Sequence, residues 1–178
     1  MVPDLADGVV ILTRYTDEDA RAHLAGEDEE TARRFGRWPW TSTEATVQDT
    51  FAGYARNWET SGPIRAFALR EQATGRLLGG CELRIQPGGS AHVTYWTSAG
   101  ERGHGHATRS LTLLLRYAHS IGFDEVEAHI APDNQASCRV AEKAGFRRTG
   151  PFTAADGATM IRYRAIPAGT QWLRARRP

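Results

Sequence analysis

The segment ERGHGHATRS, from Glu101 to Ser110, places two glycines directly before an expected helix. Gly103 and Gly105 permit a positive φ and a close approach of the backbone to a ligand. A helix N-terminus offers unpaired N–H groups and a positive partial charge. Phosphate groups bind where these two features combine. We therefore predict that this segment binds a phosphate-containing ligand, with a tight turn that binds nothing as the alternative.

Three phosphate-binding patterns can be compared with this segment. A P-loop requires a lysine after its last glycine, and the segment contains no lysine. A dinucleotide fingerprint requires a third glycine where this chain has Thr108, and its acidic residue belongs at the end of the next strand. Glu125 lies 20 residues after Gly105 but at the start of that strand. The third pattern, R-x-x-G-x-A, fits the residues from Arg102 to Ala107.

The elements around this segment alternate between strand and helix periodicity. Short turns separate three consecutive strands before the glycines, which predicts an antiparallel meander. After the glycines, we expect a helix, a strand, a helix capped by Asn134 and Gly145, and two further strands. The expected strands are 9–16, 64–71, 77–85, 90–97, 124–131, a strand from 146 and 158–166, and the expected helices lie within 17–36 and at about 41–60, 105–120 and 134–145.

The composition is that of a soluble globular protein, with 40% hydrophobic and 24% charged residues in 178. We expect one mixed α/β domain over residues 1–178 with a core at about 9–166. The net charge of +1 argues against nucleic acid or a membrane as the main partner. Cys81 and Cys138 form no C-x-x-C pattern or zinc-ligand spacing, so we expect a reducing cytoplasm and no metal. Neither a signal peptide nor a bilayer-spanning run is expected.

A second motif, DNQASCRVAEKAGF, follows the glycine segment after one helix and one strand. In this order and spacing, the two motifs resemble the GNAT superfamily of acyl-CoA-dependent N-acyltransferases. The second motif resembles the pattern N-x-x-S-x-x-V-x-E-K-x-G-F of its RimJ/RimL-like branch. The resemblance covers the chain from about Val9 to Ile166. The matching residues of the second motif are Asn134, Ser137, Val140, Glu142, Lys143, Gly145 and Phe146.

The resemblance implies a GNAT fold, of class α/β (α+β), with acetyl-CoA as co-substrate. Its mixed, mostly antiparallel sheet of about seven strands would be splayed between the fourth and fifth strands and flanked by about four helices. The pantetheine of CoA would pair with a bulged fourth strand at Tyr95, Trp96 and Thr97. Asn134 would contact it, or serve only as a helix cap. The loop residues expected to hold the pyrophosphate are Arg102, Gly103, His104, Gly105, His106, Ala107 and Thr108.

The resemblance implies the proton donor, whereas residue type and strand position suggest the base. Ser137 would lie near the CoA sulfur as a proton donor, since the chain has Ala141 where many members have a tyrosine. Glu82 or His92 could take the proton of the amine, although a strand glutamate that faces solvent is the alternative for Glu82. Arg37, Trp38 and Trp40 would line the acceptor pocket, with a buried aromatic hinge as the alternative.

The resulting prediction is an N-acetyltransferase that moves an acetyl group from acetyl-CoA to a primary amine. The amine would attack directly in a ternary complex, and a protein N-terminus or a small molecule could supply it. A homodimer through exposed strand edges is compatible with the resemblance. Two alternatives stay open: a non-catalytic acyl-CoA-binding module of the same fold, and a nucleotide-binding oxidoreductase domain.

Overall fold

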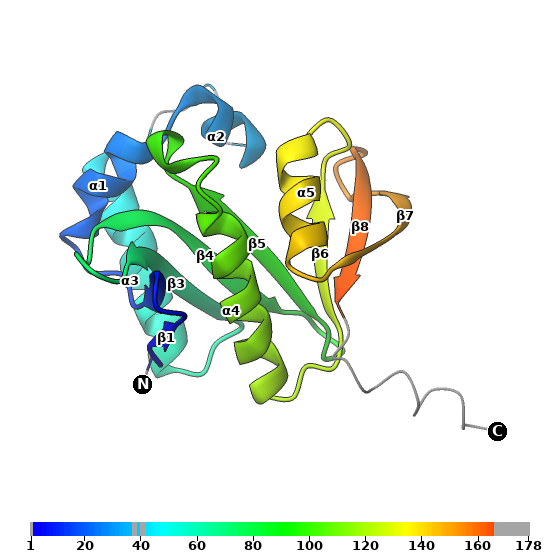
Figure 1. Ribbon diagram of the computed structural model, residues 1–178, viewed down its shortest axis with the longest axis horizontal. Helices are drawn as coiled ribbons and strands as arrows, with labels where there is room; N and C mark the ends of the chain where they lie inside the picture. The colour runs from blue at the N-terminus through cyan, green and yellow to red at the C-terminus, as the bar shows by residue number, and fades with distance from the viewer. Residues whose placement is uncertain (1, 37–38, 40–41, 166–178) are drawn as a thin grey trace.

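The computed structural model describes residues 2–36, 39 and 42–165, which form one eight-stranded sheet with helices on both faces (Figure 1). The strand order is β1-β2-β3-β4-β5-β6-β8-β7. The strands are β1 (Leu5–Ala6), β2 (Val10–Thr13), β3 (Ile64–Glu71), β4 (Leu77–Ile85), β5 (Ala91–Thr97), β6 (Val126–Ile130), β7 (Arg147–Thr153) and β8 (Thr159–Ala165). The helices are α1 (Asp19–Gly26), α2 (Glu29–Arg34), α3 (Glu44–Glu59), α4 (His106–Ser120) and α5 (Gln135–Lys143).

The pairing confirms the predicted fold class and the predicted meander. Strands β3, β4 and β5 are consecutive antiparallel neighbours, and β5 pairs with β6 in parallel. All other neighbouring strands in the sheet are antiparallel. The sheet contains one strand more than expected, because the two-residue strand β1 adds to the edge at β2. Such a short strand has no alternation from which it could have been predicted.

Helix α4 crosses one face of the sheet, and α3 packs on the other (Figure 1). The apolar residues of α4 recur at intervals of three and four, which places them on one side of the helix. Leu111, Leu114 and Ala118 are fully buried there, and Leu113 and Tyr117 extend the buried face. This packing fixes the position of the α4 N-terminus, where the glycine segment ends.

The sheet opens between β5 and β6, as expected. These strands pair only at Ala91 with Val126 and at His92 with Glu127, and then diverge. The bulge expected in β5 is absent, however, because its register with β4 is continuous from Ala91 to Thr97. The opening therefore arises where the parallel pairing ends, and helix α5 lies beside the gap (Figure 1). Beyond His92, the backbone groups of β5 that face β6 have no partner in the β-ladder.

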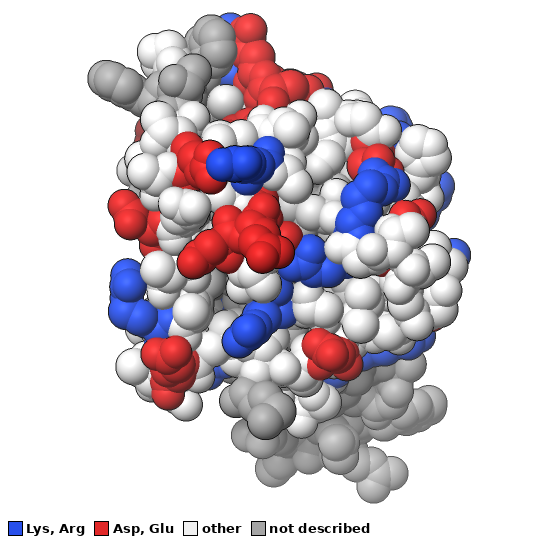
Figure 2. Space-filling model, turned by 90° about the vertical axis from the view of Figure 1, so that its left-hand side faces the viewer, with Lys and Arg blue, Asp and Glu red and all other residues white. Residues whose placement is uncertain are grey.

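Charged side chains of both signs are mixed on the surface in Figure 2, where Lys and Arg lie among Asp and Glu. This distribution agrees with the net charge of +1. None of the helices in the described part of the chain is long and apolar enough to cross a membrane.

Candidate active site

The glycine segment forms a loop that turns into α4. Gly103 and Gly105 have φ of 83° and 81°, in the left-handed region that side chains rarely adopt. Gly105 is the N-cap of α4, so the first N–H groups of the helix follow it directly. An added Cβ at either glycine would meet no atom within 4 Å. The backbone angle, and not the space, therefore requires glycine at both positions.

A cavity of about 380 Å³, which we call the loop pocket, lies between this loop, β5 and α5. It brings together residues that are far apart in sequence but were assigned to the cofactor from the two motifs. His104 is the one member of that set that does not line the pocket. The predicted cofactor residues that line it are Tyr95, Trp96, Thr97, Arg102, Gly103, Gly105, His106, Ala107, Thr108, Asn134 and Ser137.

The side chain of Arg102 braces the loop against the N-terminus of α2. Its guanidinium donates to both carboxylate oxygens of Asp28 at 2.7 Å and to Thr31 Oγ1 at 2.7 Å. The hydrogen bond from Arg102 holds the pKa of Asp28 well below its usual range. Arg102 is thus committed to a protein partner, so any contribution to phosphate binding would come from its backbone.

Two further cations line the loop pocket, and the sequence analysis gave them no role in binding. Arg139 and Lys143 lie four residues apart on α5, which places them on the same side of the helix. Their four-residue spacing in the second motif could have indicated that they lie on one side of a helix. Together they add positive charge to the wall opposite the glycine loop.

The hydroxyls of Tyr95 and Ser137 meet across the gap between β5 and α5. Their oxygens are 2.6 Å apart, and either can be the donor. Asn134 Oδ1 accepts from the Ser137 N–H at 3.0 Å, so its side chain caps α5. Burial raises the pKa of Tyr95 to about 12, which keeps its hydroxyl protonated at neutral pH. The two sequence motifs gave no role to the Tyr95 hydroxyl, which the fold places beside Ser137.

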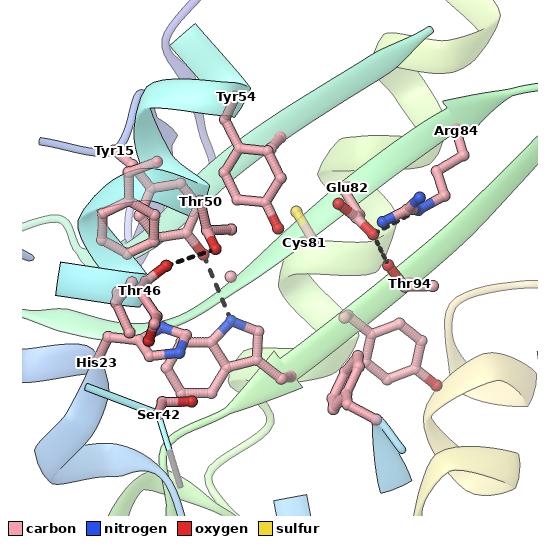
Figure 3. A pocket seen from close by; sticks show the side chains of 17 residues that line it. Tyr15, His23, Ser42, Thr46, Thr50, Tyr54, Cys81, Glu82, Arg84 and Thr94 are labelled. Atoms are coloured by element: carbon pink, nitrogen blue, oxygen red, sulfur yellow. Dashed lines mark hydrogen bonds and ion pairs between the residues drawn. The ribbon is translucent and has the colours of Figure 1, made fainter. Parts of the chain in front are cut away.

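A second cavity of about 330 Å³, which we call the aromatic pocket, lies on the face of the sheet opposite α4. Residues of β4, β5, α1 and α3 line it (Figure 3). The rings of Tyr15 and Phe51 are stacked, with their centroids 4.2 Å apart. Those of His23 and Trp96 meet edge to face, with their centroids 4.4 Å apart. Gly80 makes this packing possible, because a Cβ there would lie 1.7 Å from the Tyr15 hydroxyl oxygen. Of these residues, only Trp96 was predicted to belong to a site, and that was the cofactor site. The other contacts have no local sequence signal, because they join three separate elements.

Glu82 lies in the wall of the aromatic pocket and is 9% exposed, so the solvent-facing alternative is wrong. Its Oε1 accepts from Arg84 Nε and from Thr94 Oγ1, each at 2.7 Å (Figure 3). Its Oε2 is buried and has no hydrogen-bond partner among the described residues. The carboxylate is therefore held in place through one oxygen, while the other remains able to accept a proton.

His92, the other predicted base, lines neither pocket. Its ring lies 4.4 Å from the ring of His129, near the point where β5 pairs with β6. Burial is the main cause that lowers the pKa of His92 to about 4; the neighbouring His129 and Arg84 contribute to this shift, and Glu127 opposes it. His92 is consequently a weak base outside the pockets, and the geometry favours Glu82 for that role.

The depressed pKa of His92 predicts a pH dependence of stability. A histidine with an ordinary pKa of 6.5 when unfolded and about 4 when folded binds its proton more tightly in the unfolded chain. The contribution of His92 to the free energy of unfolding is therefore complete above pH 6.5. It is lost as the pH falls towards 4, by up to about 3 kcal/mol. We expect His92→Gln to reduce the change of melting temperature with pH over this range, as measured in thermal scans. The control His119→Gln should keep the wild-type slope, and equal slopes in all three proteins would contradict this assignment.

The two pockets meet at β5, because Tyr95 and Trp96 line both of them. The predicted acceptor residues Arg37, Trp38 and Trp40 lie outside the described residues. Phe35 and Ser42, on either side of that segment, line the aromatic pocket.

The strand order, the opening between β5 and β6 and the glycine loop before α4 together form the mixed α/β fold of a GNAT acetyltransferase. Residues 10–147 match the family model described as acetyltransferase (GNAT) domain. The chain therefore belongs to the GNAT acetyltransferase family.

Similarity to individual proteins is more limited. A stretch of 62 residues is 36% identical to the probable N-acetyltransferase YjcK of Bacillus subtilis, and it spans 34% of each chain. The comparison thus covers about a third of that relative. Among solved structures, the ribosomal α-N-protein acetyltransferase RimL in complex with coenzyme A has a TM-score of 0.75, 17% identity and coverage of 92% of this chain and 98% of its own. RimJ of Mycobacterium smegmatis, with CoA-disulfide, has a TM-score of 0.73, 22% identity and coverage of 93% and 86%. At these identities, the similarities show a shared fold.

Proposed function

We propose that this protein is an acetyl-CoA-dependent N-acetyltransferase of the RimJ/RimL-like type that acts on a primary amine. The observation that carries this proposal is the meeting of two pockets at Tyr95 and Trp96 of β5. A donor in the loop pocket and an acceptor in the aromatic pocket would react across this strand. Direct attack in a ternary complex requires such an arrangement.

The loop pocket would bind acetyl-CoA. The N–H groups at the start of α4 and in the glycine loop suit its pyrophosphate, and Arg139 and Lys143 suit a further phosphate. The pantetheine would pair with the backbone groups of β5 that face the opening and lack a partner in the β-ladder. The structures of RimL and RimJ with bound CoA or CoA-disulfide support this assignment by the similarity of the fold.

The aromatic pocket would bind the amine, either a protein N-terminus or a small molecule. Ring faces such as those of Tyr15 and Phe51 attract an ammonium group. Glu82 Oε2 would then remove a proton, directly or through one water. The free amine attacks the thioester carbon, whose oxygen a backbone N–H of β5 would polarise. The C–S bond breaks, and the thiolate takes a proton from the Tyr95 and Ser137 hydroxyls. The nitrogen of the new amide loses its extra proton, which restores the hydroxyl pair.

Two measurements test this proposal. Calorimetric titration with acetyl-CoA should show micromolar binding, while NAD should show none. Thiol release should then depend on an added amine in a panel of peptides with free N-termini, polyamines and amino acids. Binding without thiol release for any amine would favour the non-catalytic module. A preference for NAD would favour the oxidoreductase domain.

The paired hydroxyls make a separate prediction. Ser137→Ala and Tyr95→Phe should each lower kcat by about 10- to 100-fold, because either change removes part of the proton source for the thiolate. The Kd of acetyl-CoA in calorimetry should change less than kcat, because the pyrophosphate contacts remain. Ser120→Ala, at the far end of α4, is the matched control and should leave both values unchanged. Wild-type kcat in both variants would exclude the hydroxyl pair as the proton donor.

A further inference from the structure

The loop that leads into α4 brings together three side chains that can bind a metal ion. Glu101, His104 and His106 each offer a ligand atom, and these atoms all lie within 4.8 Å of one another. No other group of three His, Cys, Asp or Glu side chains in the described residues meets this distance. The group does not match a Cys/His pattern of zinc ligands in the sequence, because one of its three ligands is a carboxylate.

The two oxygens of Glu101 face different partners. Oε1 accepts from Arg76, which holds the carboxylate in position from β4's side of the loop. Oε2 lies 3.7 Å from His106 Nε2, which is longer than a hydrogen bond. Two ligand atoms bound at about 2.0–2.2 Å to a tetrahedral zinc ion are separated by about 3.4 Å. The observed separation is therefore close to what a shared ion would impose.

The His106 ring is largely buried beside Glu101. Its side chain is 15% exposed, and its Nδ1 is buried with no hydrogen-bond partner among the described residues. The ring of His104 lies 5.8 Å from that of His106 and nearly parallel to it, and His104 is exposed. The third ligand can thus adjust to an ion without disturbing the core.

We propose that Glu101, His104 and His106 form a binding site for a divalent transition-metal ion such as Zn²⁺. Imidazole and carboxylate groups are ligands that such ions accept. Three protein ligands leave a coordination position for water or another ligand. Glu101 and His106 also line the loop pocket, so the ion would add positive charge to the wall that we assign to the pyrophosphate. The site itself exists without any bound CoA.

Titration of the tag-free protein with Co²⁺, in the absence of CoA, tests this site directly. We expect a single ion with micromolar affinity and visible absorption bands typical of a cobalt ion with nitrogen and oxygen ligands. His104→Ala and Glu101→Gln should each weaken binding at least about tenfold, because each removes one of three ligands. Zn²⁺ should displace Co²⁺ and raise the melting temperature of the wild type.

His119→Ala is the matched control, since it removes a histidine from the opposite end of α4. It should bind Co²⁺ as tightly as the wild type. His104 is exposed, so its replacement should leave the fold intact, and circular dichroism checks this. Absence of binding in the wild type, or full binding in both His104→Ala and Glu101→Gln, would overturn the proposal. The result does not depend on acetyl transfer, which is measured separately.

Discussion

Replacing Glu82 by glutamine is expected to lower kcat by about 10²- to 10⁴-fold, the usual contribution of a general base. The substitution keeps the shape of the side chain and an oxygen that can accept from Arg84 and Thr94. It removes the basicity of Oε2, which is buried in the aromatic pocket without a partner. The amine would then remain protonated, and an ammonium cannot attack a thioester. Steady-state thiol release at saturating acetyl-CoA measures this loss.

The Kd of acetyl-CoA should stay unchanged in Glu82→Gln, because Glu82 does not line the loop pocket. This separation of kcat from Kd distinguishes a base from a residue that merely supports the fold. Glu142→Gln is the matched control: Glu142 lines neither pocket and accepts from the Tyr163 hydroxyl at 3.4 Å. If Glu82→Gln retains wild-type kcat, another group or water must deprotonate the amine.

Replacing Gly105 by valine should weaken acetyl-CoA binding at least about tenfold, which corresponds to about 1.4 kcal/mol. Gly105 has a φ of 81°, and a β-branched residue is strongly disfavoured there. The loop would have to change its path, although an added Cβ has free space. The N–H groups before α4 would then no longer converge on the pyrophosphate. Calorimetric titration with acetyl-CoA measures the effect.

Gly122→Val provides a control with the same kind of strain. Gly122 follows the other end of α4 with a φ of 95°, and a Cβ there also meets nothing within 4 Å. Both variants should therefore lose comparable stability in thermal scans, while only Gly105→Val should lose affinity. Unchanged affinity in Gly105→Val would remove the phosphate cradle as an explanation of the loop. Equal loss in both variants would show that lowered stability is the cause.

Local patterns predicted much of the fold. Helix periodicity predicted α4 at about 105–120, and Asn134 and Gly145 marked the ends of α5. These signals work because helix periodicity and end residues depend on the neighbouring backbone. The prediction of a bulge in β5 was wrong. It came from the resemblance, and no residue pattern in the strand supports it.

The sequence by itself determined the family of this protein, its order of elements and the residues of the glycine loop, because short motifs carry these signals in contiguous residues. Only the tertiary structure decided which side chains face a pocket. Glu82 became a buried carboxylate because Thr94 and Arg84 hold it, and Tyr95 met Ser137 because β5 and β6 diverge. Such contacts depend on strand register and helix placement, which distant parts of the chain set together.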